Sequence, residues 1–188
     1  TMCMHFNLIT WPGYLCYCGD MGTFVYSRLD DMFEFFRTKR HDGQLRINLS
    51  YWSEKLRAVD GNRMSGSAMV FDEERYIQVV KEQLVTWMRE ECKNAEERRE
   101  LREHVEEKLL GVGLFGSIPG SSEEAVRMAS DFIEKVGEKT YRFIDFWDHR
   151  LETYSYFFIW CCYALAWGIQ KYDEAASASL GQTGGASV

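Results

Sequence analysis

Residues 153–170 of this chain read TYSYFFIWCCYALAWGIQ, and the fold depends on what this stretch becomes. It holds 18 consecutive uncharged residues, which is at the lower edge of a transmembrane span. It also contains three Tyr, a Thr, a Ser, a Gln and a Gly, has few aliphatic residues, and stands alone in the sequence. A helix buried in a globular core fits this composition better than a membrane span. We therefore expect a buried aromatic helix near the C-terminus, and no membrane partner.

Three short segments near the beginning of the chain have the character of β-strands. Residues 5–10 (HFNLIT), 14–18 (YLCYC) and 23–28 (TFVYSR) are rich in aromatic and β-branched residues. A Pro-Gly turn separates the first two, and the run GDMG (residues 19–22) separates the second pair. GDMG matches neither glycine motif that binds phosphates, and strand-like residues follow it. We interpret it as a hairpin turn and predict a small antiparallel meander.

Helical segments should fill the remainder of the chain. Polar residues that can accept hydrogen bonds from free backbone N–H groups precede the segments with helical apolar spacing. The candidate N-caps are Asp30 or Asp31, Asn48 or Ser50, Asp72, Asn94 and Ser121. We expect the helix after Asn48 to end at Asp60-Gly61 and the helix after Ser121 to reach Val136. Residues 141–150 (YRFIDFWDHR) should also be helical.

These segments together predict an α+β fold: a small N-terminal three-stranded antiparallel meander followed by about five or six helices around a buried aromatic C-terminal helix. A chain of 188 residues, 46% of them hydrophobic, has a suitable size for one domain. We expect residues 1–174 to form a single α+β domain. Residues 175–188 have low complexity and should form a flexible C-terminal tail.

The chain is acidic, and its acidity is concentrated in the middle. The formal net charge is -7, and residues 71–150 hold 13 Lys and Arg against 19 Asp and Glu. This balance argues against direct nucleic-acid binding, which needs a basic surface. The six cysteines follow no secretory leader, so we expect reduced, mostly buried thiols in a bacterial cytoplasm. We expect no metal and no cofactor.

The predicted helix after Asn94 is the first candidate site. Its apolar positions are few, which leaves a wide solvated face. Glutamates on this face could bind a basic partner and could imitate a row of phosphates. The predicted partner-binding residues are Glu96, Glu97, Glu100, Glu103, Glu106 and Glu107. The alternative interpretation is an ordinary solvated helix face with Glu–Arg pairs.

Residues 145–152 form the second candidate site. Asp145, Asp148, His149 and Glu152 are spaced so that they would share one face of a helix. Carboxylates with an imidazole can hold a metal or perform acid–base chemistry. A charged first turn of the C-terminal helix explains the same residues, so we expect no catalytic residues. A small metal-dependent, nuclease-like enzyme that uses this face is the alternative.

Three stretches have distinctive aromatic composition: GYLCYCGDMGTFVYSRLDDMFEFFR, INLSYWSEKL and FIWCCYALAWGIQKYD. They resemble a family of small uncharacterised proteins of phages and prophages, over most of the chain. The resemblance brings no catalytic residues. It implies an accessory protein made in an infected bacterial cell.

The sequence thus predicts a non-enzymatic phage or prophage protein that binds a bacterial host protein or ribonucleoprotein complex. In its most concrete form it is an anti-CRISPR-like inhibitor that blocks a nucleic-acid-binding surface of a defence effector, by analogy with other small acidic phage proteins. A dimerising helper in phage replication is a further alternative. The sequence does not determine the oligomeric state.

Overall fold

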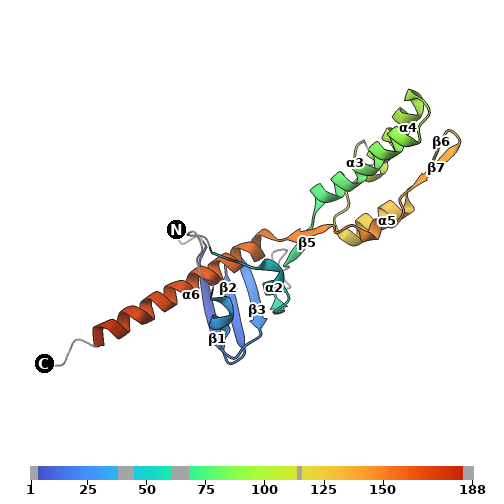
Figure 1. The fold of residues 1–188 in the computed structure, drawn as a ribbon. Helices are drawn as coiled ribbons and strands as arrows, with labels where there is room; N and C mark the ends of the chain where they lie inside the picture. Colours follow the sequence, from blue (N-terminus) through green and yellow to red (C-terminus); the bar gives the residue numbers. More distant parts are fainter. Residues whose placement is uncertain (1–3, 38–44, 61–67, 114–115, 184–188) are drawn as a thin grey trace. The chain divides into compact units, whose positions relative to one another are not determined.

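The chain divides into two compact units in a computed structural model, which describes residues 4–37, 45–60, 68–113 and 116–183 (Figure 1). Unit 1 comprises Thr1–Met69 and Tyr154–Val188, and unit 2 comprises Val70–Thr153. Each unit has a hydrophobic core of its own. The second core forms because apolar residues of the inserted segment pack among themselves. A single domain over residues 1–174 stays a prediction.

Unit 1 is built on a four-stranded antiparallel sheet with strand order β1-β2-β3-β4. The strands are β1 (Phe6–Trp11), β2 (Tyr14–Gly19), β3 (Gly22–Ser27) and β4 (Leu56–Val59). The first three confirm the predicted meander. Side chains alternate along β2 and β3, so that Leu15, Tyr17, Phe24 and Tyr26 are fully buried on one face.

Two short helices of unit 1, α1 (Met32–Phe36) and α2 (Leu49–Ser53), begin at the predicted caps Asp31 and Asn48. The expectation that the second of them continues to residue 60 is wrong. It ends at Ser53, and β4 pairs with β3 instead. This pairing satisfies backbone groups along β3 that a longer helix would leave open.

The last helix, α6 (Tyr156–Thr183), packs on the buried face of the sheet. Phe158, Cys161, Leu165 and Ile169 point into the core and are essentially inaccessible. The predicted buried aromatic C-terminal helix is thereby confirmed, and with it the α+β class. Across the residues that the structure describes, no helix combines the length and the apolar character needed to cross a membrane.

The same helix is longer than the sequence predicts. A flexible tail was expected from residue 175, whereas α6 continues to Thr183. Alanine-rich sequence favours helix, which explains the continuation. The end of the expected tail, residues 184–188, lies outside the described residues.

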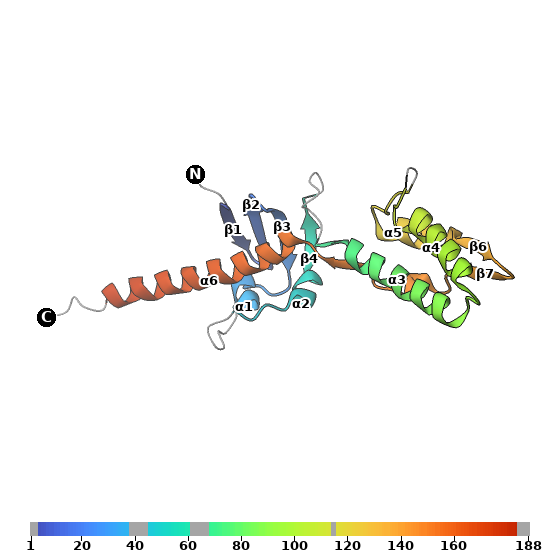
Figure 2. The ribbon, with the colours of Figure 1, turned by 90° about the horizontal axis from the view of Figure 1, so that it is seen from above.

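Unit 2 is a helical layer with a β-hairpin (Figure 2). Its elements are α3 (Glu73–Glu90), α4 (Ala95–Leu109), α5 (Ser122–Asp131), β6 (Ile133–Val136), β7 (Lys139–Arg142) and the 3-10 turn η2 (Phe146–Asp148). The predicted caps Asp72, Asn94 and Ser121 are confirmed, since each side chain accepts a backbone N–H of the first turn. A two-stranded sheet of β5 (Met69–Phe71) and β8 (Glu152–Tyr154) carries the chain into and out of this unit.

The β6–β7 hairpin replaces the end of one predicted helix and the beginning of the next. The helix after Ser121 ends at Asp131, not at Val136, and residues 141–150 form a strand and the turn η2. Gly137 has a φ of +60° in the hairpin turn, a conformation that glycine adopts without strain. Phe132 and Val136 face the core while Ile133 and Lys135 face away, so the pattern has the period of a strand.

Candidate functional site

The six predicted glutamates all lie on α4, but on different faces of the helix. Leu101, Val105 and Leu109 are buried and define the side of α4 that faces the core of unit 2. At 3.6 residues per turn, four exposed glutamates fall in one line opposite them. We call these four the glutamate ridge: Glu96, Glu100, Glu103 and Glu107.

The carboxylates of the glutamate ridge are largely unpaired. Within the described part of the chain, Glu96 has a single ion pair, a 3.9 Å contact with Arg99, and Glu100, Glu103 and Glu107 form neither an ion pair nor a hydrogen bond through their carboxylates. From Glu96 to Glu107 the ridge covers eleven steps along the helix, or about 16 Å at 1.5 Å per residue. Four negative charges therefore stand about 5 Å apart along one exposed line.

The other two predicted glutamates have different surroundings. Glu97 accepts a hydrogen bond from the Lys93 backbone N–H at 2.6 Å and lies against Gly137 of the hairpin turn. Glu106 is half-buried, on the flank of α4 away from Glu97. The structure thus divides the predicted set, and leaves four of its six members on the exposed line.

On the flank of α4 that faces the hairpin, two side chains form ion pairs with Glu134 of β6. The Glu134 carboxylate contacts His104 Nδ1 at 2.9 Å and also pairs with Lys108 Nζ. Only 14% of its side chain is exposed. The sequence predicts a helix at Glu134, and a helix there gives no sign of a pairing with α4; the pairing depends on strand β6. His104 and Lys108 are therefore paired with Glu134 and not with a glutamate of the ridge.

Net charge is distributed very unevenly between the two units. Residues 70–153 contain 13 of the 22 Lys and Arg and 20 of the 29 Asp and Glu, so the rest of the chain contains nine of each. Unit 1 is therefore neutral and unit 2 carries the whole charge of -7. A negative field of this kind attracts a basic surface at long range.

The second candidate site does not form the expected face. The helix that was to align its four residues is absent: Asp145 precedes η2 with a φ of 54°, Asp148 ends η2, and Glu152 begins β8. Asp145 lines one hollow with Ile133 and Arg142, whereas His149 and Glu152 line another with Arg150. No three potential metal ligands come together among the described residues.

Three of the described cysteines, Cys16, Cys161 and Cys162, have thiols with a raised pKa. All those that the structure describes are free. Burial raises the pKa of Cys161 well above its ordinary value and raises the pKa of Cys162 to about 12. Partial burial, with a smaller contribution from neighbouring Cys18, also raises the pKa of Cys16. Because only the thiolate is a nucleophile or metal ligand, these groups are poorly suited to either role.

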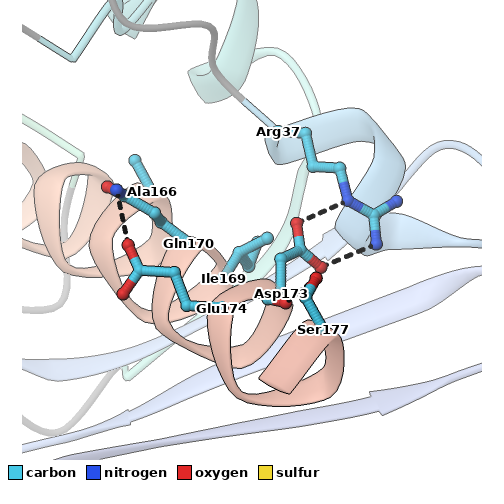
Figure 3. A pocket seen from close by; sticks show the side chains of 7 residues that line it. All are labelled: Arg37, Ala166, Ile169, Gln170, Asp173, Glu174 and Ser177. Atoms are coloured by element: carbon cyan, nitrogen blue, oxygen red, sulfur yellow. Dashed lines mark hydrogen bonds and ion pairs between the residues drawn. The ribbon is translucent and has the colours of Figure 1, made fainter. Parts of the chain in front are cut away.

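A hollow of about 680 Å³ in unit 1 is lined by Arg37, at the end of α1, and by residues of α6 (Figure 3). Arg37 donates to both carboxylate oxygens of Asp173, at 2.9 and 3.1 Å, and Gln170 Nε2 donates to Glu174 at 2.9 Å. The hydrogen bond from Arg37 lowers the pKa of the Asp173 carboxyl. The Arg37–Asp173 pair joins the two helices, so its groups have a structural role in this hollow.

Comparison of this chain with known protein families, with curated proteins and with solved structures found no match.

Proposed function

We propose that this chain is a non-enzymatic phage or prophage protein that binds a basic, nucleic-acid-binding surface of a bacterial host protein or ribonucleoprotein complex. In its sharpest form it is an anti-CRISPR-like inhibitor of a defence effector in the bacterial cytoplasm. The observation that supports this proposal is the glutamate ridge, in which Glu100, Glu103 and Glu107 are exposed and unpaired within the described structure.

The dimensions of the ridge suit a surface that evolved to hold phosphates. One strand of duplex DNA carries a phosphate roughly every 3.4 Å along the axis. A ridge of about 16 Å therefore spans the length of roughly five phosphates with four carboxylates. The neutral charge of unit 1 means that the attraction comes from unit 2.

The test uses three tagged forms of the full chain. The first is the wild type, and the second replaces Glu100, Glu103 and Glu107 with Lys. The third is a control with the same change in charge on α3, replacing the exposed Glu74, Glu82 and Glu90 with Lys. Each form is used to capture proteins from bacterial lysate that contains defence effectors, over a series of salt concentrations. Captured proteins are quantified by mass spectrometry, with and without added duplex DNA.

We expect a nucleic-acid-binding protein that is retained by the wild type and the control, displaced by DNA and released by salt. The ridge variant should bind it at least about 100-fold more weakly, because three attractive contacts become repulsive. Equal retention by the ridge variant would refute the role of the ridge, and loss of binding in the control alone would place the contact on α3.

A further inference from the structure

The outer edge of β1 is open in the described structure. β1 is the terminal strand of the sheet, and its six residues, FNLITW, contain no charge and no proline. Natural sheets usually protect such edges with charges, prolines or bulges, because an open edge is a template for another strand. An unprotected edge of this length is therefore unusual unless it is used.

The register identifies which backbone groups point outward. The Asp20 N–H donates to the His5 carbonyl at 3.0 Å, so His5 belongs to a hydrogen-bonded pair with β2. Hydrogen-bonded and non-hydrogen-bonded pairs alternate along an antiparallel ladder. The backbone N–H and C=O groups of Phe6, Leu8 and Thr10 therefore point away from β2, toward the open edge.

A hollow of about 430 Å³ lies directly beside this edge, between β1 and α6. Phe6 and Leu8 line it from the strand, and Trp167 and Tyr172 line it from the helix. The helix can run this close because residue 168 is glycine: a Cβ there would lie 2.9 Å from Leu8 Cδ1. The aromatic walls are accessible, since Trp167 is 49% and Tyr172 59% exposed.

The helix also continues beyond the edge strand. In two perpendicular views, α6 passes β1 and extends past the sheet toward its C-terminal end (Figures 1 and 2). The residues of this extension from Glu174 to Ser179 are exposed. A strand added to β1 would pack against this part of α6, as the existing sheet packs against the preceding turns of the helix.

We propose that the edge of β1 and the adjoining hollow bind an extended, uncharged segment of a partner protein by strand addition. Main-chain hydrogen bonds to Phe6, Leu8 and Thr10 provide affinity, and large apolar side chains at alternate positions of the segment enter the hollow. Strand addition and alternate side-chain contacts follow from the two-residue period of a strand.

The available area favours a short segment over a second copy of this chain. Aromatic side chains bury about 150–250 Å² each, so the exposed halves of Trp167 and Tyr172 offer roughly 200 Å² together. A stable globular dimer needs about 800 Å² from each partner. An edge of six residues with one small hollow offers less than that area. A short extended segment can bind with the edge and the hollow alone.

The probe is a library of displayed eight-residue peptides, selected on the full-length wild-type chain. We expect enrichment of uncharged peptides with apolar residues at alternate positions. A selected peptide is then synthesised with and without N-methyl groups on alternate amides, which removes the donors that face β1. Only one of the two alternating sets of amides can face β1. Binding should therefore weaken at least about tenfold when that set is N-methylated, and little when the other set is. Amide exchange at Phe6, Leu8 and Thr10 should slow when the unmodified peptide binds.

Two variants and one control locate the contact. Thr10→Pro removes an outward N–H and no backbone hydrogen bond to β2, although it also removes the bond from Thr10 Oγ1 to the Tyr14 carbonyl. Trp167→Ala removes one side of the hollow. Each variant should weaken binding. Ile9→Lys, on the opposite face of β1, should not. Binding should change little with salt because unit 1 is neutral. This feature separates the proposal from the salt-dependent contact of the glutamate ridge.

The proposal is overturned if no peptide is enriched, if N-methylation has no effect in either register, or if Trp167→Ala binds as tightly as the wild type. It is also overturned if the wild type is a dimer that Thr10→Pro dissociates, since a second copy would then occupy the edge. Because the peptide measurements use the wild-type chain, they decide the question even if Thr10→Pro fails to fold.

Discussion

Arg37 and Asp173 form a two-point ion pair that joins α1 to α6 over 136 positions of sequence. The two side chains are about two-fifths exposed, so solvent screens their attraction. We expect Asp173→Asn to lower the free energy of unfolding by less than about 1 kcal/mol at pH 7. Denaturation in urea, followed by tryptophan fluorescence, measures this difference.

The same pair predicts a dependence on pH. The Asp173 pKa is lowered in the folded chain, so the unfolded chain takes up the proton first as the pH falls. The contribution of the pair is therefore fully present above the ordinary pKa of 3.8 and is lost as the pH falls through the lower folded value. The wild type and Asp173→Asn should converge in stability at acid pH. A constant difference down to about pH 2 would contradict this account.

Replacement of Phe158 tests the core between α6 and the sheet. This side chain is fully buried and contacts Phe24 edge-on at a ring distance of 5.9 Å. Phe158→Ala should lower the free energy of unfolding by about 3–5 kcal/mol. Tyr163, on the same helix and 51% exposed, is the matched control, and Tyr163→Ala should cost less than about 1 kcal/mol. Equal losses of unfolding free energy in the two variants would contradict the packing of Phe158 between α6 and the sheet.

Two glutamates of the β6–β7 hairpin provide a test of unit 2. Glu134 is 14% exposed and pairs with His104 and Lys108, whereas Glu138 is 85% exposed and pairs with Lys93. Glu134→Ala should cost about 1.5–3 kcal/mol, since it removes charge-assisted hydrogen bonds from a largely buried position. Glu138→Ala should cost at most about 1 kcal/mol. Thermal unfolding of the two variants measures the order, and the reverse order would refute the docking of the hairpin on α4.

Thiol reactivity reports the burial of the cysteines. Cys161 and Cys162 are fully buried and have raised pKa values, so neither should react with iodoacetamide at pH 8 in the folded chain. Both should react after unfolding in urea. Cys16 and Cys18 are only half-buried and act as internal controls. Mass spectrometry of the labelled peptides distinguishes the four positions, and rapid labelling of Cys161 in the native chain would contradict its place in the core.

Local signals explain where prediction succeeded. Asp72, Asn94 and Ser121 act as caps because their short side chains reach the backbone N–H group three residues ahead, which needs no tertiary contact. The strands of the meander were predictable for a similar reason, since turn residues and β-branched or aromatic runs are local features. The glutamate ridge could be foreseen in part, because helical spacing alone places Glu96, Glu100, Glu103 and Glu107 together.

The predictions of secondary structure are wrong where the local sequence is compatible with both a helix and a strand. Leu56–Val59 follows a helix and could continue it, but it forms a strand because it pairs with the edge of β3. Residues 141–150 have helical spacing of charges, but Tyr141 and Phe146 are buried in the core of unit 2 from a strand and a turn. Tertiary packing outweighs weak local propensity in such segments.

The sequence by itself determined the α+β class, the caps that begin most of the helices, and the buried character of the C-terminal helix, because these depend on local hydrogen bonding and on apolar periodicity. Only the tertiary structure decided the division into two units, the pairing of Glu134 with α4, and the open edge of β1 beside Gly168. These features depend on which distant segments meet, and that outcome is set by the packing of whole elements against one another.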